Sequence, residues 1–211
     1  SVTNVDYGVW VNNWDGYPTS GGSNAGRTKA KLDGITITDT DLGGIYLKDN
    51  SLNTGGASAY VNAVIQNCAI NTAGTGIIIE GADATVSFAG VAPQASISSA
   101  SKYIVLKSNS VDVPAGNIDA TNVSFDGIPG SAMTLAQLFA TEDKIDHKID
   151  LATLGFVTVK AENAFVTDIA APTSTNNDYT RILNAVELVS NNWSINLHGT
   201  FDWTETNAAA S

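Results

Sequence analysis

The stretch Gly44-Ile45-Tyr46-Leu47 has the pattern that decides the fold: one glycine or aromatic residue, followed by three residues dominated by isoleucine, valine and leucine. The same pattern occurs three more times, as Gly8-Val9-Trp10-Val11, Gly76-Ile77-Ile78-Ile79 and Tyr103-Ile104-Val105-Leu106. The four segments begin 36, 32 and 27 residues apart. Recurrence at such intervals is typical of architectures built from repeated structural units.

Short β-prone runs surround these segments and are separated by Gly, Asn, Ser and Asp. They cover residues 2–5, 35–38, 64–70, 85–88 and 118–125. Runs this short do not make stable independent hairpins, but stacked coils bury them against the coil above and below. Each coil needs about 20 to 30 residues, which agrees with the intervals. The sequence therefore predicts an all-β chain folded as a right-handed parallel β-helix, or β-solenoid.

Two short amphipathic helices are predicted in the C-terminal part. The first spans residues 134–142, with Thr134 as its candidate N-cap and one apolar face. Residues 179–189 follow Asp178 as a candidate cap. The faces consist of Leu135, Leu138 and Phe139 in the first helix, and Ile182, Ala185, Val186 and Val189 in the second.

Part of the chain resembles the connector between β-helical modules in very large secreted bacterial surface proteins. The similarity covers residues 117–205, with its centre in residues 141–167, Thr-Glu-Asp-Lys-Ile-Asp-His-Lys-Ile-Asp-Leu-Ala-Thr-Leu-Gly-Phe-Val-Thr-Val-Lys-Ala-Glu-Asn-Ala-Phe-Val-Thr. Where that family has a Gly-Asp pair after its capping helix, this chain has Asn191-Asn192-Trp193. The resemblance implies coils over 1–130, a helix-plus-strand connector over 131–177, and a capping helix with the first strand of an incomplete β-helix over 178–211.

Composition restricts the setting and the partners. Charged residues make up only 15% of the 211 residues, which favours an extracellular or cell-surface protein over a cytosolic enzyme. A net charge of −11 repels phosphate backbones, so nucleic acid is not an expected partner. No stretch is long and apolar enough to predict membrane insertion. The single cysteine, Cys68, is expected to be a buried apolar residue.

Aromatic residues near the N-terminus form a candidate carbohydrate site. Trp10, Trp14 and Tyr17 alternate with amide and carboxylate side chains. Aromatic faces beside such groups can hold a sugar by stacking and hydrogen bonding. The alternative is that Trp10 lies in the interior and the other two anchor a loop.

Two groups of polar residues are candidate sites for chemistry. Asp39 and Asp41, with Asp33 nearby, can bind calcium or share acid–base work on a sugar if they converge, although Asp-Thr-Asp before two glycines is also an ordinary turn. His147 lies between Asp143 and Asp150 and can ligate a metal if the three converge. The alternative for this second group is a solvated connector with local ion pairs.

Both ends of the chain carry apolar residues that an isolated coil would leave bare. They are Val2, Val5, Trp193, Phe201 and Trp203. Uncovered strand edges favour pairing with further modules of the same polypeptide or with other copies, and head-to-tail contacts build filaments.

The sequence thus predicts a structural, adhesin-like module without enzymatic activity and without a cofactor other than the calcium alternative. It stacks into an extracellular filament in this interpretation. The alternatives are a carbohydrate-binding module, and a polysaccharide lyase or hydrolase on the same scaffold.

Overall fold

A computed structural model describes residues 1–13, 27–49, 60–81, 83–108, 115–189 and 192–202. Its strands are β1 (Val2–Asn12), β2 (Arg27–Asp33), β3 (Thr36–Lys48), β4 (Tyr60–Gln66), β5 (Cys68–Asn71), β6 (Thr75–Glu80), β7 (Ala84–Ala89), β8 (Ala95–Ser98), β9 (Lys102–Lys107), β10 (Ile118–Asp119), β11 (Val123–Phe125), β12 (Ile128–Pro129), β13 (Ile145–Asp146), β14 (Val157–Thr158), β15 (Asn163–Thr167) and β16 (Ser194–His198). Its helices are the 3₁₀ helix η1 (Gly130–Ala132) and the α-helices α1 (Leu135–Glu142) and α2 (Asp178–Leu188).

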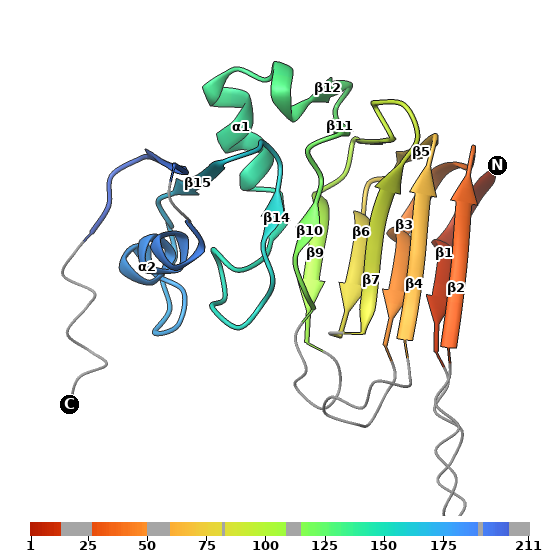
Figure 1. Cartoon of the computed structure of the whole chain (residues 1–211), viewed down its shortest axis with the longest axis horizontal. Helices are drawn as coiled ribbons and strands as arrows, with labels where there is room; N and C mark the ends of the chain where they lie inside the picture. The colour runs from red at the N-terminus through yellow and green to blue at the C-terminus, as the bar shows by residue number, and fades with distance from the viewer. Residues whose placement is uncertain (14–26, 50–59, 82, 109–114, 190–191, 203–211) are drawn as a thin grey trace, which may run out of the picture.

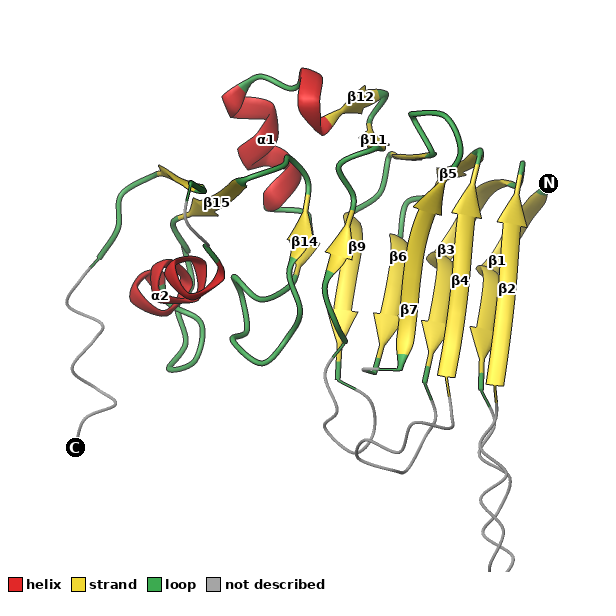
Figure 2. Ribbon diagram, in the orientation of Figure 1, coloured by secondary structure: helices red, strands yellow, loops and turns green. Residues whose placement is uncertain are grey.

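The largest sheet is mixed and has the strand order β12-β11-β8-β5-β3-β6-β9-β13, with β1 also paired to β3. Its pairs are parallel except for β11 with β12, which are antiparallel. The sheet curls into an open half-barrel, and α1 and α2 lie beyond it toward the C-terminus (Figures 1 and 2). The expected right-handed parallel β-helix, or β-solenoid, is therefore wrong.

Strand β3 explains the difference. The sequence around Asp39 favours a turn between two short strands, but the chain passes through it as one strand of 13 residues with Asp39 at a φ of 55°. Residues 36–38 of β3 pair with β5, and residues 43–48 pair with β6. Because the two halves of β3 pair with different strands, the strands on the β5 side and those on the β6 side form one continuous bent sheet rather than successive closed coils.

The recurring segments of the sequence lie side by side in register. Val9 is opposite Ile45, Ile45 is opposite Ile77, and Ile77 is opposite Ile104. β13 extends this row with Ile145. The four isoleucines are buried at the centre of the main apolar core. Each buried side chain of this size contributes about 1.5–3 kcal/mol relative to exposure, so the row is a major source of stability.

The glycine that opens three of these segments has a packing role. A Cβ atom on Gly44 would lie 2.7 Å from the carbonyl oxygen of Gly76 and would overlap the side chain of Ile70. Gly8 and Gly76 are crowded in the same way by the next strand and by an isoleucine. The space of the missing side chain is therefore already occupied by the neighbouring rows.

Smaller sheets complete the β-structure. β2, β4 and β7 form a parallel three-stranded sheet whose inward residues join the main core, and two-stranded parallel pairs link β10 with β14 and β15 with β16. Cys68 is buried and belongs to the same core, as expected. The predicted division of the chain after residues 130 and 177 stays a prediction.

Both predicted α-helices are confirmed, with corrections of detail. Thr134 caps α1 in a capping box with Gln137, as its position suggests. In α2 the cap is Asn177 rather than Asp178, because its side chain accepts the backbone N–H of Thr180. None of the helices in the described ranges is long and apolar enough to cross a membrane.

The C-terminal helix packs on a second, smaller core. This core contains Ile149, Phe156, Ala164, Val166 and Ala185, and several half-buried residues pack against it. Of the predicted apolar stripe on α2, Ala185 is buried and Val186 is exposed. The buried face of α2 also carries polar residues, among them Arg181 and Asn184.

Candidate functional site

An exposed aromatic cluster on β1 and β3 is the first candidate site. It consists of Tyr7, Trp10 and Tyr46, which we call the aromatic ladder. The rings of Trp10 and Tyr46 stack with centroids 5.6 Å apart and an interplanar angle of 16°, and Tyr7 contacts both at a tilt. Trp10 is nevertheless 57% exposed, so much of the indole is open to solvent although Tyr46 covers one side.

Charged side chains border the aromatic ladder. The hydroxyl of Tyr46 donates a hydrogen bond to Glu80, and Lys48 Nζ pairs with the other carboxylate oxygen of Glu80 at 3.1 Å. Partial burial, followed by the hydrogen bond to Glu80, raises the pKa of Tyr46 well above its ordinary value. The phenol therefore stays neutral at physiological pH, and the ladder has fixed hydrogen-bonding groups next to an open ring.

Only one of the three predicted carbohydrate-binding residues can be placed. Trp14 and Tyr17 lie outside the described residues. Trp10 meets Tyr46 because the parallel register of β1 and β3 sets these two residues opposite each other. The sequence signal that could have found Tyr46 is its position, since both aromatics are the third residue of a recurring segment.

The predicted acidic site on β3 is not assembled. Asp39 and Asp41 are exposed on either side of buried Thr40, whose hydroxyl donates to Thr72 at 2.6 Å. Asp33 is held by Lys31 at 3.2 Å and by Asn67 at 3.1 Å. Throughout the part of the chain that the structure describes, no three His, Cys, Asp or Glu residues gather in a way that could hold a metal ion.

The residues predicted for self-association fall into two places. Val2 and Val5 lie on β1, where Val5 is 38% exposed. Trp193 and Phe201 pack against the second core and so help to hold α2 in place. Trp203 lies outside the described residues.

The imidazole of His147 is not solvated as the alternative interpretation expects, although the neighbouring Asp143 is exposed. His147 is buried, its Nδ1 accepts the backbone N–H of Val157 at 3.0 Å, and its Nε2 lies 2.5 Å from Oε1 of Glu142. Since Nδ1 is an acceptor, the ring proton is on Nε2 and is donated to Glu142. Desolvation raises the pKa of the buried Glu142, an effect that His147 opposes. Neither His147 nor Glu142 has the open coordination that a metal would need.

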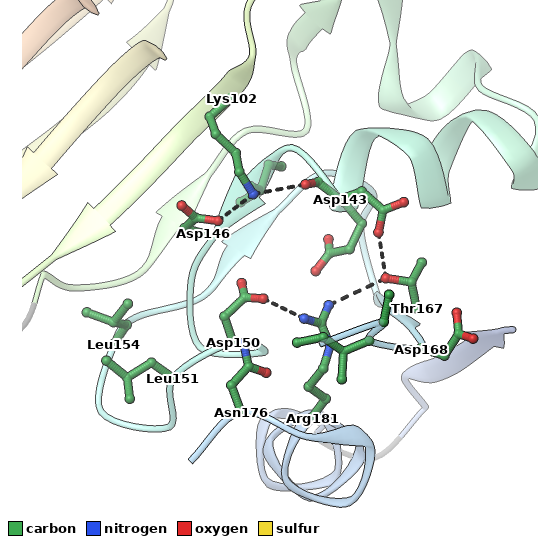
Figure 3. A pocket seen from close by; sticks show the side chains of 14 residues that line it. Lys102, Asp143, Asp146, Asp150, Leu151, Leu154, Thr167, Asp168, Asn176 and Arg181 are labelled. Carbon is green, nitrogen blue, oxygen red and sulfur yellow. Dashed lines mark hydrogen bonds and ion pairs between the residues drawn. The ribbon is translucent and has the colours of Figure 1, made fainter. Parts of the chain in front are cut away.

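A polar pocket of about 530 Å³ lies between this pair and α2. Its walls carry two cations and five carboxylates, together with a small apolar side; the lining residues are Lys102, Glu142, Asp143, Ile145, Asp146, Asp150, Leu151, Leu154, Thr167, Asp168, Ile169, Ala170, Asn176 and Arg181. Figure 3 shows Arg181 reaching from α2 toward Asp150 and Thr167, with Lys102 and Asp146 on the opposite side.

Arg181 is held in this pocket by two side-chain contacts. Its Nη1 donates to Oδ1 of Asp150 at 2.7 Å, and its Nη2 lies 3.5 Å from the hydroxyl oxygen of Thr167. That hydroxyl in turn donates to Asp143 at 2.5 Å. Sequence reasoning missed this arginine as a site residue, because its partners Thr167 and Asp150 are 14 and 31 positions away along the chain.

Comparisons with known proteins returned no match: no family model, no curated protein and no solved structure is similar to this chain. The resemblance to a surface-protein connector thus stays a prediction, and function has to be argued from the sites themselves.

Proposed function

We propose that this chain is a non-catalytic adhesive module of the cell surface that binds neutral glycan chains at the aromatic ladder. The observation that supports it is the exposed indole of Trp10, stacked on Tyr46 beside the hydrogen-bonded pair of Lys48 and Glu80. A pyranose ring can continue the stack on the open side of the indole, with its hydroxyls near the charged groups. The net charge of −11 favours neutral over polyanionic glycans.

Replacing Trp10 by alanine is expected to weaken glycan binding about tenfold, which is the loss of one aromatic stacking contact. The measurement is retardation of the protein in native gels that contain xylan, mannan or hydroxyethylcellulose. Tyr179→Ala is the matched control, because Tyr179 is an exposed aromatic residue of α2, away from the ladder. Free migration of the wild-type protein in all three gels, or equal retardation of both variants, would contradict the proposal.

Self-association is a second candidate function, favoured by the edge of the main sheet. Within the described residues, β1 pairs only with β3, so its other edge offers unpaired backbone groups, except at Asn12, whose carbonyl oxygen accepts the hydroxyl of Thr28. We expect the mean particle mass in light scattering to rise with protein concentration, and Val5→Lys to suppress that rise because a charged residue on an edge strand opposes pairing. A monomer at every concentration would exclude this candidate.

A further inference from the structure

The pocket beside α2 contains buried polar atoms that have no hydrogen-bond partner among the described residues. Arg181 is only 6% exposed, yet in the described part of the chain its Nε–H has no hydrogen-bond acceptor. Oδ1 of Asn176, on the same pocket wall, is buried without a donor. Buried polar atoms of native proteins almost always have partners, so each of these atoms is expected to bind one that the residues in the described ranges do not supply.

The geometry of Arg181 specifies the first partner. Nε and Nη2 form one edge of the guanidinium plane, and this edge has a single long contact of 3.5 Å to Thr167. Asp150 occupies Nη1 instead. An edge with two parallel N–H donors is the arrangement that binds a carboxylate with two hydrogen bonds. This edge, on which Nε–H lacks an acceptor among the described residues, therefore fits a carboxylate of a ligand.

The charge of the pocket specifies the second partner. Five carboxylates face only Lys102 and Arg181, so a ligand with negative charge alone would be repelled. Asp146 uses Oδ1 for Lys102, and Asp143 uses Oδ1 for Thr167, so that, as far as the described residues go, the second oxygen of each is available. These oxygens, and Oδ1 of Asn176, are acceptors that suit an ammonium group with its three N–H donors.

We propose that this pocket binds a free aliphatic α-amino acid. Its carboxylate lies on the Nε and Nη2 edge of Arg181, its ammonium group binds Asn176 and the acidic wall, and its side chain contacts Leu151 and Leu154. A zwitterion carries no net charge and so satisfies both requirements at once. The site is distinct from the aromatic ladder, and the proposal stands whether or not the ladder binds glycans.

Isothermal titration calorimetry of the full chain with L-leucine, leucine methyl ester and N-acetyl-leucine tests the proposal. We expect leucine to bind, and each derivative to bind at least about tenfold more weakly, because the ester lacks the carboxylate and the acetyl form lacks the ammonium group. This comparison uses the wild-type protein and so does not depend on the folding of any variant. Equal binding of the three compounds, or no binding of leucine at millimolar concentration, would overturn the proposal.

Arg181→Lys locates the site. Lysine keeps the positive charge beside Asp150 but removes the two-donor edge, so leucine affinity is expected to fall about tenfold. Trp10→Ala is the control, because it alters the aromatic ladder only and should leave leucine binding unchanged. Circular dichroism of each variant checks the fold. Leucine binding that survives Arg181→Lys in a folded protein would place the ligand elsewhere and reject this pocket.

Discussion

Replacing Gly44 by alanine is expected to destabilise the protein by about 3 kcal/mol, the upper part of the usual range for overpacking. The added methyl group would lie 2.7 Å from the carbonyl oxygen of Gly76 and against Ile70. The carbonyl belongs to the backbone of β6, which pairs with β3 over this region, so it cannot retreat without breaking strand pairing. Urea unfolding followed by circular dichroism measures the loss.

Gly116→Ala is the matched control for this substitution. A Cβ atom on Gly116 would meet no other atom within 4 Å, so the same chemical change is expected to alter stability by less than about 0.5 kcal/mol. If the two variants unfold at the same urea concentration, β3 and β6 do not pack as closely at Gly44 as the structure shows.

The recurring segments show how far sequence reasoning reaches for this fold. Their common pattern indicates that they occupy equivalent positions in the fold. In the structure they lie on neighbouring strands, with Val9, Ile45, Ile77 and Ile104 aligned in one row. The path between them was not predictable in the same way. Whether Asp39 ends a strand or bends it depends on the partners of β3 on both sides, and this decided between closed coils and a curled open sheet.

Of the three residues of the aromatic ladder, the sequence identifies only Trp10 as a candidate site residue. The polar residues beside Trp10 in the sequence nominate it, whereas the rings that it contacts are Tyr7 on the same strand and Tyr46 on β3. Tyr46 is 36 residues distant and becomes its neighbour through strand register. Local composition can nominate an exposed aromatic residue, but only the register of the sheet shows which rings it stacks on.

The composition around His147 does not indicate that its imidazole is buried. Its density of charged residues favours solvent exposure, yet β14 brings the backbone of Val157 over the imidazole, and α2 adds Arg181. The apolar pattern of α2 was equally ambiguous, since Val186 is exposed while Arg181 and Asn184 are buried. Periodicity locates a helix, but it does not decide which face turns inward when the inner face carries a polar network.

Replacing His147 by leucine is expected to cost about 2–5 kcal/mol, because two buried polar groups lose their partner at about 1–3 kcal/mol each. The leucine leaves the buried carboxylate of Glu142 without its donor, and it leaves the N–H of Val157 without its acceptor. Urea unfolding at neutral pH measures this loss. A stability close to that of the wild-type protein would mean that the imidazole does not hold these two groups.

Glu142→Gln is expected to have the opposite effect at neutral pH and to be at least as stable as the wild-type protein. Its amide oxygen still accepts the imidazole N–H, but no charge has to be buried. Burial raises the folded-state pKa of Glu142 above the 4.5 of an unperturbed glutamic acid, so the folded form holds this proton more tightly than the unfolded form. The resulting stabilisation is complete below that value and is lost as the pH rises through the folded-state pKa.

The stability difference between the glutamine variant and the wild-type protein should therefore widen in favour of glutamine as the pH rises from about 4.5, by about 1.4 kcal/mol for each pH unit until the folded-state pKa is passed. Urea unfolding of both proteins at a series of pH values between these limits measures the difference directly, and shared titrations of other groups cancel. A constant difference across the series would mean that Glu142 ionises as freely in the folded protein as in the unfolded chain. The carboxylate would then be solvated, and the buried pair with His147 would not exist in solution.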